Sequence, residues 1–175
     1  MRALIVYESM FGNNRVVAEA IAAGMAPHAT AEVVEVGAAP AAVPPDVDLL
    51  VVGGPNHAFG MSRTSTRQQA AQEAEGPLVS SGIGLREWLE ALPHASRAIP
   101  FAAFDSRVDK GVIRTVDRTA GMIAKRLKKR GFRRLTEVGS FYVEDMKGPL
   151  VEGEADRARA WGEELARLAT AAPVG

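Results

Sequence analysis

Short apolar-rich runs alternate along the chain with segments in which apolar residues recur every three or four positions. The runs cover residues 4–7, 31–36, 47–54 and 98–104, and a fifth, interrupted run lies within 135–145. Continuous apolar runs of this length are typical of strands that are covered on both faces of a sheet. The pattern therefore predicts five strands, of which 47–54 is the most apolar and the most central.

The segments between these runs have helical spacing. Apolar residues follow a period near 3.6 in 17–25, 85–92, 116–127 and 161–172, and a short helix is predicted near 67–75. Pro27 and Pro93 end two of these helices, and Gly131 ends a third. Strand and helix alternate five times, which predicts an α/β doubly wound fold of three layers around a parallel sheet. Ligands bind such sheets at the carboxyl ends of the strands, so the loops after strands one, three and four are the candidate site.

Composition narrows the class of protein. The 175 residues suit one domain, residues 1–175, and the 21 basic and 21 acidic residues give no net charge to attract nucleic acid or a membrane surface. Cysteine is absent, which excludes disulfides, thiol nucleophiles and iron–sulfur clusters. No apolar run is long enough for a signal peptide or a membrane span. We expect a cytoplasmic protein.

The first loop, Ser9-Met10-Phe11-Gly12-Asn13-Asn14, has the composition of a phosphate site. A helix N-terminus offers unpaired N–H groups and partial positive charge, Gly12 lets the backbone approach a ligand, and the Ser and Asn side chains add donors. The alternative is a simple helix cap, for which one such residue is enough.

Several other site types do not fit the sequence. Only Gly12 is present where a dinucleotide fold needs Gly-x-Gly-x-x-Gly, and the Gly-Lys-Ser/Thr of a Walker loop is absent. A phospho-receiver domain needs Asp after strands one and three, where this chain has Tyr7-Glu8-Ser9 and Gly53-Gly54-Pro55. The three histidines are scattered, and no catalytic triad, carboxylate pair or metal-ligand cluster supports a hydrolase.

With these motifs in register, the sequence resembles the flavodoxin-like family. The segment "SMFGNN" is similar to the family's FMN phosphate loop, and "GGPNHAFG", residues 53–60, is similar to the flavin-ring loop of its quinone-reductase branch. The resemblance covers nearly the whole chain and implies FMN as the cofactor and a sheet order of 2-1-3-4-5. Three features depart from the family's pattern: Asn14 and Asn56 replace threonines, and the loop after strand four lacks the Tyr that often stacks on the flavin.

The resemblance assigns cofactor contacts to three loops. The residues it places against FMN are Ser9, Met10, Phe11, Gly12, Asn13, Asn14, Pro55, Asn56, His57, Ala58, Phe59, Gly60, Asp105, Ser106 and Arg107. Phe59 and His57 are the candidates for stacking on the ring, with core packing and a turn role as their alternatives.

Charged residues raise two further questions. Arg63 and Arg107 are placed to stabilise a reduced, negatively charged flavin, although a solvated loop charge is the plainer interpretation of Arg107. The segment 125–134 is rich in basic residues. It is either a solvated helix end or a docking patch for an acidic partner.

Three functions remain open. The first is an FMN-binding electron-transfer protein that meets a redox partner protein, with no role for nucleic acid or an integral membrane segment. The second is an FMN-dependent NAD(P)H:quinone-type oxidoreductase, for which residues 61–82 supply a wall or lid over the ring. The third is a flavodoxin fold that has lost FMN and serves as an interaction module.

Overall fold

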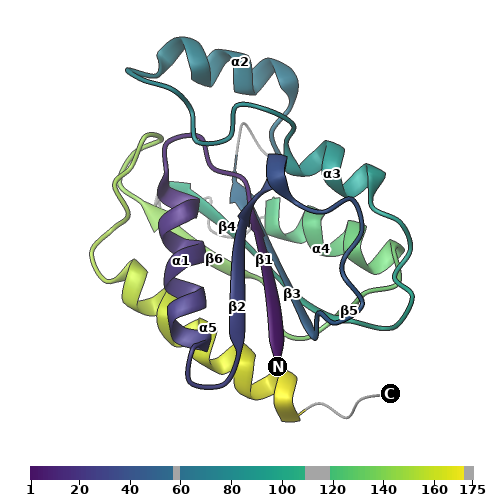
Figure 1. Ribbon diagram of the computed structural model, residues 1–175. Coiled ribbons are helices and arrows are strands. Elements are labelled where there is room, and N and C mark those ends of the chain that lie inside the picture. The colour runs from purple at the N-terminus through teal and green to yellow at the C-terminus, as the bar shows by residue number, and fades with distance from the viewer. Residues whose placement is uncertain (57–59, 109–118, 172–175) are drawn as a thin grey trace.

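The computed structural model describes residues 1–56, 60–108 and 119–171. Its middle layer is a parallel sheet in the order β2-β1-β3-β4-β5, with β6 also paired to β4 (Figure 1). The strands are β1 (Arg2–Tyr7), β2 (Thr30–Glu35), β3 (Leu49–Pro55), β4 (Pro100–Val108), β5 (Arg133–Arg134) and β6 (Gly139–Val143). The helices are α1 (Asn13–Met25), α2 (Thr64–Glu73), α3 (Leu85–Ala91), α4 (Thr119–Lys129) and α5 (Glu154–Ala171), with a 3₁₀ turn at Val36–Ala38. The predicted fold class and strand order are confirmed.

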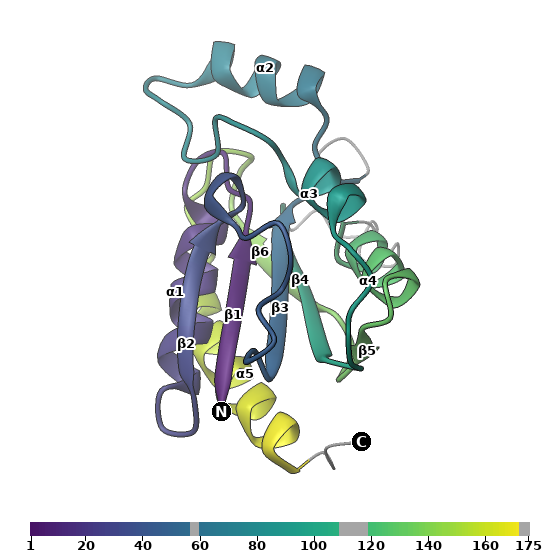
Figure 2. The ribbon, with the colours of Figure 1, turned by 45° about the vertical axis from the view of Figure 1, so that its right-hand side comes forward.

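Two helix layers bury opposite faces of the sheet. Leu4 and Val6 of β1 pack in the cluster that contains the α3 and α4 side chains, whereas Ala3 and Ile5 pack in the cluster of α1 and α5. Figure 2 shows the two layers on either side of the strands. Alternate residues of one strand therefore face two separate cores, which explains the continuous apolar run at residues 4–7.

The fourth and fifth strands differ from the prediction. Strand β4 continues to Val108, four residues past the predicted end, so the polar residues after Phe104 are strand and not loop. The fifth strand is in two pieces: β5 pairs with the start of β4 at Pro100–Phe101, and β6 pairs with its end at Phe104–Val108. The interruption predicted at Gly139 falls just before it, because β6 begins at that residue.

The predicted helices are present, with shifted ends. The short helix expected near 67–75 is α2, and the last helix begins at Glu154, seven residues before Trp161. Val116 and Ala172, the expected ends of two helices, lie outside the described residues. Within the part of the chain that the structure describes, no helix is long and apolar enough to cross a membrane.

Glycines bring α1 and α5 into backbone contact. A Cβ on Gly24 would lie 1.9 Å from the backbone oxygen of Arg159, and one on Gly162 would lie 2.1 Å from that of Ile21. Gly24→Ala is therefore expected to lower the free energy of unfolding by about 1–3 kcal/mol, although alanine is normally the better helix residue. Chemical denaturation of this variant beside Gly76→Ala, whose Cβ meets open space, measures the effect. Equal stability of the two variants would contradict the close packing.

Candidate functional site

A cleft of about 190 Å³ opens at the carboxyl ends of the parallel strands. It lies where β1, β3, β4 and β6 end, which is the position expected for a ligand in this class of sheet. Its walls are Ser9, Met10, Phe11, Asn13, Asn14, Pro55, Asn56, Thr66, Gln69, Ala70, Glu73, Ser106, Arg107, Val108, Val143 and Met146. Nine of the predicted site residues are among them.

The loop between β1 and α1 forms one side of the cleft. Gly12 has φ +94°, a left-handed conformation that favours glycine, and a Cβ at this position would point into open space. The Oγ of Ser9 accepts a hydrogen bond of 3.0 Å from the Gly12 N–H, and no side chain caps the helix. The first N–H groups of α1 have no intrahelical partner, so this loop presents donors and positive potential.

Asn14 is the most informative side chain of this loop. It is 1% exposed, and its Oδ1 has no hydrogen-bond partner among the described residues. Buried polar atoms are almost always paired, so an unpaired one at a cleft needs an explanation. A ligand that hydrogen-bonds to this amide would provide it.

Residues 79 and 80, far along the chain, hydrogen-bond to the backbone at the start of the same loop. Ser80 N–H donates to the Ser9 carbonyl at 2.8 Å, and Ser80 Oγ accepts from the Ser9 N–H at 3.0 Å. Val79 N–H donates to the Met10 carbonyl at 3.1 Å. These bonds fix the backbone at the base of the loop, and nothing in the sequence pattern at Ser80 indicated them.

The second loop is described only in part. Pro55 and Asn56 line the cleft, and Asn56 is fixed by a bond from its N–H to the Ser106 carbonyl (3.0 Å) and by the Thr119 hydroxyl, which donates to its Oδ1 (3.2 Å). His57, Ala58 and Phe59, including both stacking candidates, lie outside the described residues. Gly60 is buried beside Met122 and does not line the cleft.

The end of β4 carries a buried ion pair. Arg107 reaches Asp105 through three hydrogen bonds of 2.8–3.0 Å and also donates to Ser140 Oγ at 2.8 Å. Asp105 is 0% exposed and accepts from the Ala120 N–H at 3.1 Å. The interpretation of Arg107 as a solvated loop charge is therefore wrong: it lines the cleft as one half of a neutral pair, while Asp105 lies beneath it and does not reach the cleft.

Helix α2 forms a further wall of the cleft, and none of its residues is among the cofactor contacts predicted from the sequence. Thr66, Gln69, Ala70 and Glu73 lie on one face of α2 and line the cleft. Val108, Val143 and Met146 complete the wall from β4, β6 and the segment after it. The unusual length of residues 61–82 is the sequence feature that indicates the four α2 residues.

Few aromatic side chains reach the described part of the cleft. Phe11 lines it, but Phe104 is fully buried and packs edge-to-face on Phe141 at 6.1 Å, so Phe104 belongs to the core. Arg63 is exposed at the start of α2 and is not among the cleft residues. Neither Phe104 nor Arg63 lines the described part of the cleft.

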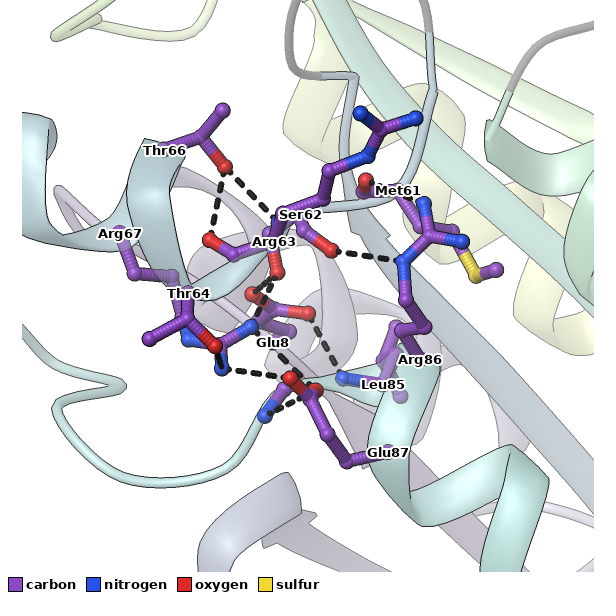
Figure 3. Close-up of polar contacts among 11 residues, drawn as sticks. Glu8, Met61, Ser62, Arg63, Thr64, Thr66, Arg67, Leu85, Arg86 and Glu87 are labelled. Atoms are coloured by element: carbon purple, nitrogen blue, oxygen red, sulfur yellow. Dashed lines mark hydrogen bonds and ion pairs between the residues drawn. The ribbon is translucent and has the colours of Figure 1, made fainter.

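A buried carboxylate directly before the first loop links three segments (Figure 3). Glu8 accepts hydrogen bonds from the Ser62 hydroxyl and from the Leu85 N–H, the latter at 2.8 Å. Burial raises the pKa of Glu8 above its ordinary value, while these bonds and the charge of Arg67 act in the opposite direction.

Stability should depend on this group in a specific pH window. Because its pKa is raised in the folded state, Glu8 contributes stability that is complete below its ordinary pKa of 4.5 and is lost as pH rises through the folded value. The stability of the wild-type protein relative to Glu8→Gln is therefore expected to fall above pH 4.5, by about 1.4 kcal/mol for each unit of pKa shift. Denaturant titrations from pH 4 to 8 measure this. A relative stability that rises with pH would contradict it.

The basic segment 125–134 lies far from the cleft. It covers the end of α4 and β5, and β5 pairs with the start of β4, whereas the cleft is at the end of β4. A partner docked on these residues would be at the opposite end of the sheet from the candidate site.

Comparisons with known proteins agree on the fold. No family model matches the sequence, and no curated protein matches it significantly. Among solved structures, oxidised Flavodoxin 1 from Bacillus cereus superposes with a TM-score of 0.64 at 16% identity, over 95% of this chain and 98% of that one. A flavodoxin from the domain Archaea gives 0.62 at 16% identity, over 97% and 99%. A flavodoxin, WrbA-like protein from Agrobacterium tumefaciens gives 0.58 at 17% identity, over 97% of each chain.

These likenesses extend over almost the full length of both chains in each pair, with a strand order that the sheet itself shows. The chain has the flavodoxin-like fold.

Proposed function

We propose that this protein binds FMN in the cleft at the carboxyl ends of its strands and acts in electron transfer. One observation carries the proposal: the left-handed Gly12 and the buried, unpaired Oδ1 of Asn14 lie close together in the sequence at an uncapped helix N-terminus that faces the cleft. Phosphate is the group that such a terminus favours. The flavodoxin neighbours support the choice of cofactor.

Each wall of the cleft has a role in this proposal. The N–H groups of residues 10, 11, 13 and 14 and the Asn13 side chain would hold the phosphate, while the Gly12 N–H donates to Ser9 Oγ. Asn14 would pair with a polar group of the ribityl chain, and Pro55, Asn56 and the end of β4 would lie beside the ring. When bound, FMN supplies reversible uptake and release of electrons, and the protein sets its orientation and potential.

Glu73 is expected to lower the potential of the bound flavin. Among the described cleft residues it is the one charged side chain without an opposite charge at its side, because Arg107 is paired with Asp105. Glu73→Gln removes about 1 kcal/mol of charge repulsion with a reduced flavin and should raise the two-electron midpoint potential by about 20 mV. Redox titration measures the shift. Glu75→Gln, exposed and outside the cleft, is the control and should leave the potential unchanged; a fall in potential for Glu73→Gln would contradict this electrostatic role.

An FMN-dependent NAD(P)H:quinone-type oxidoreductase is the second candidate, favoured by the wall that α2 adds to the cleft. Rapid kinetics on the FMN-loaded protein separate the two functions. A carrier is reduced slowly by NADPH or NADH alone and fast when a flavodoxin-type reductase is added. Multiple turnovers of NAD(P)H and benzoquinone without any reductase protein would reject the carrier function in favour of the enzyme.

A further inference from the structure

Helix α2 has no apolar face to hold it in place. Its sequence is TSTRQQAAQE, and only Arg67 and Ala70 are buried. Figures 1 and 2 show α2 standing above the carboxyl end of the sheet, apart from the other helices. A helix that is polar all round gains little from hydrophobic burial, so its position depends on specific polar contacts.

Those contacts converge on one side chain. Arg67 is 8% exposed and binds both carboxylate oxygens of Glu87, with Nη2 to Oε1 at 2.8 Å and Nη1 to Oε2 at 3.3 Å. Its Nη1 also donates to Ser62 Oγ at 3.0 Å. Bidentate arginine–carboxylate pairs are strong and fix geometry.

The partners of Arg67 belong to the packed part of the protein (Figure 3). Glu87 lies in the first turn of α3, where it also accepts the Gly84 N–H at 3.0 Å. Ser62 donates to Glu8, which directly follows β1. Through Arg67, α2 is thus tied to α3 and, by way of Ser62, to the residue that follows β1.

The cleft face of α2 lies beside this anchor. Ala70 is 5% exposed, whereas the next residue, Ala71, is exposed to solvent. The residues at positions 66, 69, 70 and 73 cover the cleft, and the rest of the helix surface is largely exposed. The helix therefore covers the cleft with one face, and among the described residues its ion pair with the rest of the protein is Arg67–Glu87. The segment directly before it is also fixed by Arg86, which donates to the Met61 and Ser62 carbonyls.

We propose that α2 is a lid over the cleft, and that Arg67 is the positioning residue that keeps the lid closed through Glu87. The identity of the ligand beneath the lid rests on the proposed function; the lid itself does not. Opening exposes the face that carries Ala70, and a ligand enters and leaves through this opening. Loosening the Arg67–Glu87 pair should therefore speed both steps.

The absence of cysteine allows a ligand-free test of the lid. A single thiol introduced as Ala70→Cys, at a position that is 5% exposed, should react slowly with a bulky alkylating reagent while α2 is closed and faster when α2 opens. Ala71→Cys reports a thiol that is always exposed. Adding Glu87→Gln removes the charge opposite Arg67 but keeps an acceptor for the Gly84 N–H. Arg67→Lys, as a second variant, keeps the charge and loses the bidentate fork.

We expect Glu87→Gln and Arg67→Lys each to raise the alkylation rate at position 70 by about tenfold and to leave the rate at position 71 unchanged within about twofold, which corresponds to a loss of about 1.4 kcal/mol from the closed state. Unchanged rates at position 70 in both variants would overturn the proposal. Far-ultraviolet circular dichroism confirms that each variant remains folded.

Ligand kinetics give a second readout. In stopped-flow experiments that follow flavin fluorescence, Glu87→Gln should raise both the association and the dissociation rate constant of FMN, because a lid gates both directions. Faster dissociation with unchanged association would reject gating and leave α2 as a fixed wall. If the wild-type protein binds no FMN, the proposed function fails, and the alkylation rates alone decide whether α2 is a lid.

Discussion

Gly12→Val is expected to weaken FMN binding by about 100-fold. A β-branched side chain strains the backbone at φ +94°, and its Cβ would project into the open space in front of the first turn of α1. The N–H groups of the loop then lose their approach to the phosphate. Loss of one or two hydrogen bonds to a charged group, each worth about 1.5–3 kcal/mol, accounts for the size of the effect.

A matched control separates this loss from general strain. Gly153 also has a positive φ, +84°, has open space at its Cβ position, and accepts the first backbone bond of a helix, in this case α5. Gly153→Val should cost similar stability, about 1–3 kcal/mol, and leave FMN affinity unchanged. If the two variants bind FMN with equal affinity, the first loop does not bind phosphate and is a simple helix start.

Arg107→Leu is expected to lower the free energy of unfolding by about 3–5 kcal/mol. The substitution leaves Asp105 fully buried with the Ala120 N–H as a remaining donor but no positive charge beside it. An unpaired buried charge carries this cost because the interior does not replace the water or the partner that it has lost. Equilibrium denaturation measures the change.

The second substitution Asp105→Asn should recover most of the lost stability, because asparagine removes the charge and keeps an acceptor for Ala120. An exposed ion pair provides the contrast: Arg15→Ala breaks the Arg15–Glu19 pair, whose side chains are more than half exposed, and should leave stability nearly unchanged because water screens the pair. If Arg107→Leu costs no more than Arg15→Ala, the Asp105–Arg107 pair does not stabilise the fold in the way its burial indicates.

The layers of the fold could be predicted because they follow from short-range patterns. The apolar run at residues 4–7 requires cover on both faces, and helices that alternate with such strands leave few arrangements of the sheet. The positions of the first loop and of Pro55 followed from the same pattern. Their meeting at one cleft is a consequence of the strand order.

The features that were missed depend on partners far along the chain. The sequence pattern ends the fourth strand at Phe104, too early, because Asp105 and Arg107 are polar. Their burial is possible because they pair with each other and because Arg107 also bonds to Ser140 of β6. The first two turns of α5 have few apolar residues, so they show no helical periodicity of apolar positions. The link from Ser80 to Ser9 spans 71 residues and leaves no mark in the local sequence.

The network around Glu8 shows the same limit at the site. A glutamate after the first strand has no obvious meaning until Ser62, Arg67 and Glu87 are brought to it. These residues come from the long segment after β3 and from α3. The length of residues 61–82 predicted a wall or lid over the ring, but the contacts that hold this wall are visible only in the folded chain.

Titration of the purified protein with FMN and with riboflavin, followed by the visible absorption of the flavin, tests the central claim most directly. The two ligands share the ring and the ribityl chain and differ in the phosphate. The proposed site predicts that FMN binds at least about 100-fold more tightly, because the phosphate contributes about 2.8 kcal/mol at the N-terminus of α1. Equal affinities, or no binding of either ligand at high micromolar concentration, would contradict the FMN site.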